Sequence, residues 1–270
     1  MLTTQDMINQ LTWTTPGAIR ELDYNSDYTD AGERAALAFV RNDITGTPIL
    51  DIGVGTGRTI GLLKPLSSDY RGIDYLQSMV ELSRRRYPDA TIELGDARNL
   101  PEMPADHFGF VQFSYNGIDS VSAQDRKQVL ANVYRVLVNN GLFLFSTLNM
   151  NGPIPKQRPW HMFLPQAPDP LRFAVRFARM LLWKPVEVLR WYKLRKHQES
   201  GAGFLVAPLP AHHWSILAHY TSIERQVDEL EQNGFAVVCI FSSEPGNVVL
   251  PGDDTSGIDY FHVVARKLRM

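Results

Sequence analysis

A glycine-rich turn joins an apolar run to a helical pattern at residues 49–63, which read ILDIGVGTGRTIGLL. The apolar run is typical of a buried strand, and the residues after the turn have helical spacing. Glycines let the backbone of such a turn approach a ligand closely, and the N-terminus of the following helix favours negative charge. A strand, a tight turn and a helix in this order predict an α/β fold whose turn faces a ligand.

Strand-like and helix-like segments alternate along most of the chain. Besides the strand at 48–53, we expect strands at 69–74, 90–95, 108–114, 142–149, 235–242 and 258–267. A helix is expected to begin within 56–64 and to be limited by Pro65, and further helices are expected at 76–87, 125–138 and 222–234. This alternation predicts a doubly wound, seven-stranded, mostly parallel sheet.

The alternation is interrupted between residue 150 and residue 221, where prolines, aromatic residues and a basic helical stretch occur. The ends of this block flank successive elements, between the fifth strand and the last helix. We therefore expect an insertion within a single domain that spans 1–270, and we expect residues 1–45 to form an N-terminal helical cap.

Composition narrows the class of protein. The formal net charge of −2 argues against a protein-wide electrostatic field that gathers nucleic acid. Cys239 is the single cysteine, which excludes an intramolecular disulfide and a multi-cysteine metal site. The N-terminus lacks the basic start and apolar core of a secretory signal, and no apolar run of about 18 residues occurs. A cytoplasmic protein is expected.

Three acidic residues lie where successive strands are predicted to end. Asp51 precedes the first glycine of the turn by two positions, Asp74 ends the second strand and Asp96 follows the third. Ligands of an open α/β sheet bind beyond the carboxyl ends of its strands. Asp51 suits a positively charged amino group, Asp74 the two hydroxyls of a ribose, and Asp96 an exocyclic amine. A dinucleotide-binding turn would have glycine where this chain has Arg58, so the set predicts an adenosine ligand that carries an amine.

The chain at this point resembles the class I S-adenosylmethionine-dependent methyltransferases. The resemblance is close over residues 33–150 and holds by pattern over 222–267. The matching segments are LDIGVGTGR at 50–58, YRGIDYLQSMV at 70–80, LGDARNLP at 94–101, FGFVQFSYNGID at 108–119 and VYRVLVNNGLFLFSTLN at 133–149. The resemblance implies a Rossmann-like methyltransferase fold with S-adenosyl-L-methionine as cofactor.

The resemblance also assigns roles to individual residues. It places the methionine part of the cofactor at the turn, the ribose at Asp74, the adenine at the helix and strand that follow, and an N-terminal tyrosine over the cofactor. The implied cofactor-binding residues are Tyr28, Asp51, Gly53, Gly55, Gly57, Asp74, Met79, Asp96, Ala97 and Ser114. Two alternatives stay open, because Met79 at helical spacing suits a core position and Asp74 suits a helix N-cap.

For the reaction, the resemblance implies in-line transfer of a methyl group, which needs alignment of the acceptor more than a catalytic triad. Candidates near the acceptor are Ser114, Tyr115 and Asn116. The insertion at 150–221 is expected to act as a lid over the acceptor and to contribute His212 or His213 as a general base. Adjacent histidines chelate poorly, and no third ligand is spaced suitably, so no metal is expected.

Three functions remain open from the sequence. The first is methyl transfer to N or O of a small metabolite, with the insertion as a specificity lid. The second is methyl transfer to a lipid or membrane-delivered acceptor, with the basic stretch 171–197 in peripheral contact with a membrane. The third is a non-catalytic regulatory module that binds the cofactor. For 171–197 itself the favoured reading is a lid helix packed on the domain, and a nucleic-acid surface ranks behind both others.

Overall fold

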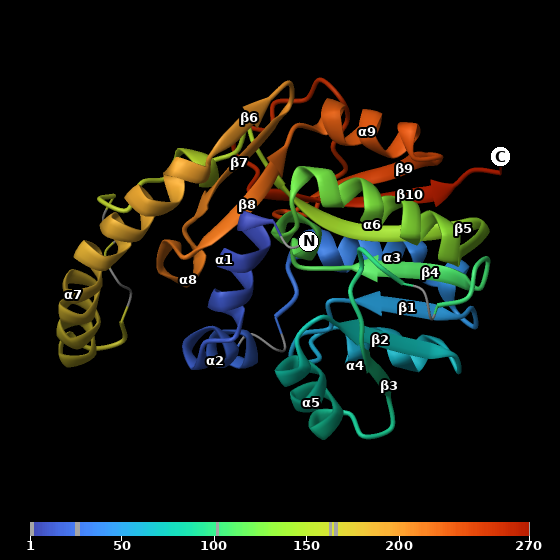
Figure 1. Ribbon diagram of the computed structural model, residues 1–270, viewed down its shortest axis with the longest axis horizontal. Helices are drawn as coiled ribbons and strands as arrows, with labels where there is room; N and C mark the ends of the chain where they lie inside the picture. Colours follow the sequence, from blue (N-terminus) through green and yellow to red (C-terminus); the bar gives the residue numbers. More distant parts are fainter. Residues whose placement is uncertain (1–2, 25–27, 101–102, 162–163, 165–166, 270) are drawn as a thin grey trace.

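A mixed ten-stranded sheet runs through the part of the chain that the structure describes. The structure is a computed structural model and describes residues 3–24, 28–100, 103–161, 164 and 167–269. The strands are ordered β3-β2-β1-β4-β5-β8-β7-β6, and β10 pairs with both β5 and β9 (Figure 1). Five strands form the parallel part: β1 Ile49–Ile52, β2 Tyr70–Asp74, β3 Thr91–Leu94, β4 Phe108–Phe113 and β5 Leu137–Asn149.

The seven predicted strands are all present, since β9 Phe235–Ser242 and β10 Tyr260–Lys267 complete the set. β10 runs antiparallel to both β5 and β9, so the sheet is mostly but not wholly parallel. The expected doubly wound, Rossmann-like architecture is confirmed. One boundary differs from the prediction, because β5 begins at Leu137, whereas the fifth strand was expected to begin at 142.

Helices cover both faces of the sheet and bury its apolar side chains. On one face, α6 Ala123–Val136 and α9 Ile223–Gln232 contribute to a core around Phe143 and Phe145. On the other face, α3 Ala31–Ile44, α4 Ile60–Leu63 and α5 Gln77–Arg86 contribute to a core around Ile49 and Phe110. This two-sided burial explains why the parallel strands are apolar runs rather than alternating ones.

The strand number differs from the prediction because the insertion adds three strands to the same sheet. These are β6 Glu199–Gly201, β7 Phe204–Leu209 and β8 Ile216–Thr221. β4 last pairs with β5 at Phe113 and Phe145, so the end of β5 has a free edge there. β8 pairs with that edge in parallel at Leu148 and Asn149, and β7 and β6 follow in antiparallel order.

The N-terminal cap consists of α1 Thr4–Trp13, α2 Pro16–Tyr24 and α3. A capping box between Thr3 and Asp6 begins α1. The buried residues of α1 are all polar, namely Gln5, Asp6, Asn9 and Thr12. Asn9 donates to the carbonyls of Ser120 and Leu217 at 2.9 and 2.8 Å. The helix is therefore docked on β8 and on the 3-10 helix Gly117–Ser120 by hydrogen bonds rather than by apolar burial.

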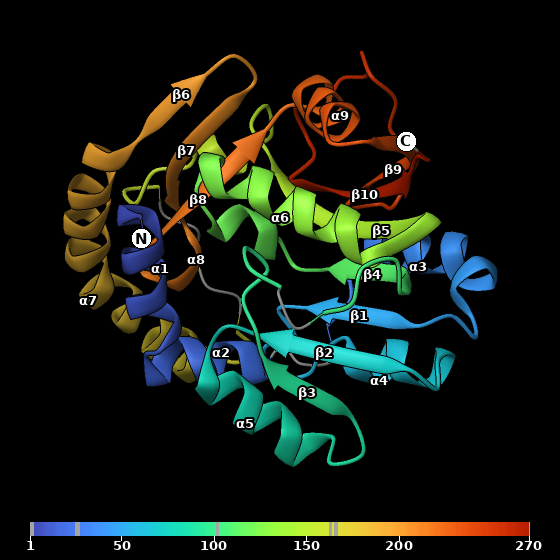
Figure 2. The same cartoon turned by 45° about the vertical axis from the view of Figure 1, so that its right-hand side comes forward.

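The long helix α7 Pro170–Leu194 lies at the outer edge of the molecule. Figures 1 and 2 show α8 Ala211–Trp214 and α1 between α7 and the body of the sheet. Trp191 is the one buried residue of α7, all of whose residues are described. Half-buried residues such as Trp183 and Glu187 face α8, so this helix packs on the domain along one side only and most of its surface stays exposed. No helix in the described ranges is long and apolar enough to cross a membrane.

Candidate active site

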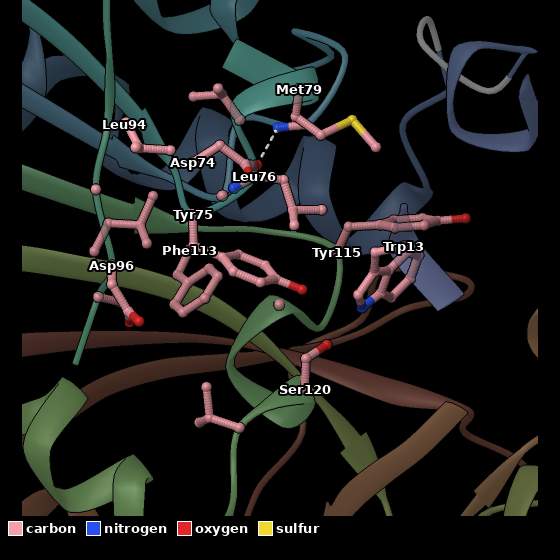
Figure 3. Close-up of a pocket in the computed structure, with 18 of the residues that line it drawn as sticks. Trp13, Asp74, Tyr75, Leu76, Met79, Leu94, Asp96, Phe113, Tyr115 and Ser120 are labelled. Carbon is pink, nitrogen blue, oxygen red and sulfur yellow. Dashed lines mark hydrogen bonds between the residues drawn. The ribbon is translucent and has the colours of Figure 1, made fainter. Parts of the chain in front are cut away.

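A cavity of about 670 Å³ opens at the carboxyl ends of β1, β2, β3 and β4 (Figure 3). The glycine turn, the ends of β2 and β3 and the segment after β4 form one part of its wall, and α1 with the 3-10 helix Gly117–Ser120 forms another. This is the edge of an open α/β sheet at which ligands bind. A cavity therefore lies where the sequence predicted a ligand-binding site.

The three glycines of the turn occupy their positions for different physical reasons. All three have positive φ, at 69° for Gly53, 54° for Gly55 and 96° for Gly57. A Cβ atom on Gly53 would lie 2.9 Å from the ring of Phe113, and one on Gly57 would lie 2.8 Å from the ring of Tyr87. A Cβ on Gly55 would meet no atom within 4 Å. Gly53 and Gly57 are thus required by packing, whereas Gly55 keeps the cavity wall bare.

Asp74 ties the turn to the end of β2 and lines the cavity. Its Oδ2 accepts a hydrogen bond from the amide of Gly55, and its Oδ1 accepts one from the amide of Leu76, both at 2.9 Å. Burial raises the pKa of Asp74 to about 6. Each carboxylate oxygen has a further lone pair, so Asp74 retains acceptor capacity toward the cavity. The N-cap residue of α5 is Leu76 and has no side-chain cap bond, so Asp74 does not cap that helix.

Asp51 differs from the prediction because it is absent from the described lining of the cavity. Its side chain is fully buried, and Oδ2 accepts hydrogen bonds from Thr59 at 2.6 Å and Tyr70 at 2.8 Å. Burial raises the pKa of Asp51 to about 6. Oδ1 has no hydrogen-bond partner among the described residues. A direct ligand contact would have to use Oδ1, because the hydrogen bonds of Oδ2 hold the turn against α4 and β2.

The adenine-side residues of the prediction meet at the same cavity. Met79, Asp96 and Ala97 all line it, together with Leu76 and Leu94 (Figure 3). Met79 is buried in the first turn of α5 and is therefore both a core residue and a wall residue. Together with Asp74, this gives an acidic edge next to an apolar wall. That combination fits a nucleoside with a flat base and free hydroxyls.

Comparison with known proteins identifies this architecture. Residues 49–141 match the model of a family described as a methyltransferase domain. The chain contains a class I S-adenosylmethionine-dependent methyltransferase domain. A demethylmenaquinone methyltransferase of Thermotoga maritima is 31% identical over 107 residues, which are 37% of this chain and 42% of that protein. A bifunctional biotin-biosynthesis protein of Cellvibrio japonicus is 27% identical over 46% of this chain and 24% of its own length. The chain thus spans less than half the length of these relatives.

Solved structures share the fold at low sequence identity. A 1,6-didemethyltoxoflavin N1-methyltransferase of Burkholderia thailandensis, solved with its substrate and S-adenosylhomocysteine, has a TM-score of 0.55 at 13% identity, covering 94% of this chain and 89% of that one. A putative methyltransferase of Haloferax volcanii, in complex with the activator Trm112, has a TM-score of 0.57 at 13% identity, covering 99% and 100%. These likenesses support the methyltransferase fold over nearly the whole chain, including the parts outside residues 49–141.

The residues of the methyltransferase cavity fit the cofactor of this class on three structural grounds. Asp74 offers carboxylate lone pairs where a ribose would lie, and the wall at Gly55 is free of side-chain atoms. Asp51 has a buried oxygen without a donor next to the turn. A sulfonium ligand with an ammonium group and two ribose hydroxyls supplies the donors that these acceptors lack.

Arg58 is the site residue that the sequence interpretation missed. It lines the cavity, forms a buried ion pair with Glu33 and donates from Nη2 to the hydroxyl of Ser114 at 2.9 Å. Its guanidinium lies 5.2 Å from the ring centre of Tyr115. The sequence showed Arg58 only as a departure from the dinucleotide pattern, and nothing in the spacing linked it to an acid in α3.

Two of the three predicted residues after β4 face the cavity. Ser114 and Tyr115 line it, whereas Asn116 is not in the described lining. The backbone N–H of Asn116 donates to the hydroxyl of Ser146. Tyr115 and Asn116 have left-handed backbone angles, with φ of 53° and 57°. Burial raises the pKa of Tyr115, so its phenol remains protonated at neutral pH and is a donor rather than a base.

The two predicted lid histidines do not reach the cavity. His212 lies 2.9 Å from a carboxylate oxygen of Glu21 in α2, and His213 lies 2.9 Å from one of Glu187 in α7. No residue of 150–221 that the structure describes lines the cavity, so the prediction of the insertion as its lid is not supported. α1 occupies the expected place instead, through Asn9 and Trp13.

Two further expectations concern Tyr28 and metal binding. Tyr28 is 46% exposed and is not in the described lining, but its backbone carbonyl accepts a hydrogen bond from Arg58 at 2.9 Å. It therefore supports a cavity residue without facing the cavity. Among the described residues, no group of three or more histidine, cysteine or acidic side chains is arranged to hold a metal ion.

Proposed function

We propose that this protein transfers the methyl group of S-adenosylmethionine to a nitrogen or oxygen atom of a small-molecule acceptor. The observation that carries the proposal is the continuity of the cavity. One cavity extends from Asp74 and Met79, which suit the cofactor, to Trp13 and Ser120, which lie beyond it. A cofactor-binding module without an acceptor would not require the second part.

The cofactor supplies an activated methyl group, and the residues of this chain align the acceptor and exclude water. α1 closes one side of the cavity with Asn9 and Trp13. Ser114 accepts a hydrogen bond from Arg58, which leaves its own proton free to orient an acceptor. The protonated phenol of Tyr115 offers a second donor at the same wall.

The chemistry of the lining favours an acceptor that arrives with a free lone pair. The described lining contains no histidine, and the carboxylates of Asp6 and Asp96 are both paired with Arg98. A neutral nitrogen heterocycle, or another acceptor with a small barrier to proton loss, fits this wall better than an acceptor that needs a strong base. The aromatic side chains of Trp13 and Tyr115 suit a planar molecule.

Calorimetry with S-adenosylmethionine is the first test. We expect Asp74→Ala to weaken the affinity strongly, and Leu250→Ala, an exposed control, to leave it unchanged. Unchanged affinity in Asp74→Ala would remove the cofactor assignment. Incubation with methyl-labelled cofactor and a polar metabolite extract then tests transfer. Label in a polar product supports the proposal, whereas intact cofactor binding without transfer from any extract supports a regulatory module.

A further inference from the structure

The outward face of α7 carries a continuous apolar stripe. Residues spaced by three, four or seven positions share one face of a helix. The stripe consists of Leu171, Val175, Leu182, Val186 and Leu189. Leu171 and Leu182 are 76% and 78% exposed, and Leu189 is 55% exposed. Single exposed apolar residues are ordinary on a protein surface, but a stripe of this length indicates that something covers it.

Positive charge accompanies this stripe. Residues 170–197 contain eight basic side chains and one acidic side chain, Glu187, although the whole chain has a net charge of −2. By helical spacing, Arg172, Arg179 and Lys193 lie along or beside the stripe, and all three are exposed. Glu187 forms ion pairs with Lys184 and His213, both at 2.9 Å, on the side of the helix that faces the protein. Arg172 pairs with Asp169 at the start of the helix at 3.4 Å, so basic groups outnumber acidic ones on the outward face.

Aromatic residues lie at the boundary of this face. The guanidinium of Arg190 lies 5.7 Å from the ring centre of Trp183, and that of Arg195 lies 5.9 Å from the ring centre of Tyr192. Tyr192 is 51% exposed. Aromatic rings paired with cations, next to exposed aliphatic side chains, are the composition of a helix that lies at the interface of a bilayer.

We propose that α7 docks the protein on the surface of an anionic lipid bilayer. The apolar stripe would insert among the acyl chains, and the basic residues beside it would contact the anionic headgroups. A nucleic acid fits less well, because its phosphates would leave the leucines uncovered. A second copy of the chain also fits less well, because two arginine-rich faces would meet with one acid each to offset them.

The proposed docking surface lies close to the methyltransferase cavity. His213 stacks on Trp183 of α7 with ring centres 4.5 Å apart, and the adjacent His212 packs against Trp13 at 4.8 Å. Trp13 belongs to the cavity lining. Docking itself does not depend on the proposed activity. Where both hold, the Trp13 end of the cavity faces the docked helix, with α8 between them.

Co-sedimentation of the full chain with extruded vesicles tests the docking. One set of vesicles contains phosphatidylcholine alone, and the other contains about one third phosphatidylserine. We expect binding to the anionic vesicles to exceed binding to the neutral vesicles by about tenfold or more, and to weaken as salt is raised. Equal binding to both, or no binding to either, would overturn the proposal.

Two paired variants separate the apolar and the basic contributions. The first is Leu182→Glu with Leu189→Glu, and the second is Arg179→Gln with Lys193→Gln. We expect each to lower the partition onto anionic vesicles by about tenfold. The matched controls, Leu250→Glu and Arg85→Gln, alter exposed residues elsewhere, and their partition should stay within about twofold of the unmodified protein.

Two further measurements make the outcome unambiguous. The affinity for S-adenosylmethionine should be unchanged in all four variants, which confirms folding and separates docking from the proposed activity. If the glutamate pair does not fold, the glutamine pair decides alone. Variants of α7 that bind anionic vesicles as well as the unmodified protein would overturn the proposal. So would light scattering that shows a dimer broken by Leu182→Glu, because the stripe would then belong to a second copy.

Discussion

Arg98, which follows β3, forms an ion pair of 2.8 Å with Asp6 of α1. The same guanidinium contacts Asp96 at 2.6 Å and Asp125 of α6 at 3.3 Å. One side chain therefore joins the edge of the cavity at the end of β3 to α1, which forms another part of the cavity wall. Because α1 buries only polar side chains against the sheet, such contacts decide whether it stays docked.

Replacing this hub should release α1. We expect Arg98→Met to increase amide hydrogen exchange across residues 4–13 by about tenfold, with no change in α9, because α1 would lose its ion pair while the sheet core is untouched. Hydrogen exchange read by mass spectrometry measures both segments. Arg85→Met, at an exposed position, is the control. Unaltered exchange in α1 would show that the side-chain hydrogen bonds of Asn9 suffice to keep the helix docked.

Cofactor affinity should depend on pH through Asp74. Its pKa is raised to about 6 by burial, so the carboxylate, which we propose accepts the ribose hydroxyls, becomes protonated as the pH falls through that value. Binding only to the charged form predicts an affinity about tenfold weaker at pH 5 than at pH 7. Calorimetry across this range measures it. Asp74→Asn should be weak and nearly pH-independent, and a slope equal to that of the unmodified protein would assign the titration to another group.

A buried ion cluster beneath the acceptor wall should control stability. Arg126 is fully buried and contacts Asp119 at 2.7 Å and Glu229 at 3.2 Å. Arg126→Met would leave both carboxylates without their cation, which should lower the free energy of unfolding by about 3–5 kcal/mol. Urea denaturation measures this change. The neighbouring Lys127→Met, at an exposed position, should change it by about 0.5 kcal/mol or less.

The histidines of the insertion should prove dispensable for cofactor binding. His212 and His213 pair with Glu21 and Glu187 outside the cavity, so His212→Gln and His213→Gln should retain the cofactor affinity within about twofold. Calorimetry on each variant decides this. A large loss of affinity would mean that the two residues approach the ligand in a state other than the one described here.

The elements of the sheet core were predictable because each segment carries its own hydrophobic pattern. The apolar runs at 49–52 and 108–113 and the helical spacing at 125–138 are local patterns, and local patterns specify elements. Asp74 and Asp96 could be placed together for a related reason, since the carboxyl ends of parallel strands meet at one edge. No single segment had to be compared with a distant one for these predictions.

The features that the sequence did not reveal depend on what packs against each pattern. Helical spacing gives 170–194 an apolar face, but spacing alone does not reveal that Leu171, Leu182 and Leu189 are exposed. The hydrogen bonds of Asp51 to Thr59 and Tyr70 depend on how β1, β2 and α4 pack together, which no single segment shows. Strands β6–β8 were missed because they use an edge of β5 that exists only where β4 ends.

The polar docking face of α1 has a consequence for each catalytic cycle. In the proposed reaction, a ligand that enters or leaves on the α1 side of the cavity passes Asn9 and Trp13. When α1 lifts, the groups it uncovers at its contacts are amides, hydroxyls and carbonyls, and water satisfies these directly. Opening of the cavity at α1 therefore does not require transient exposure of apolar surface at these contacts, so the entrance can open often without promoting aggregation.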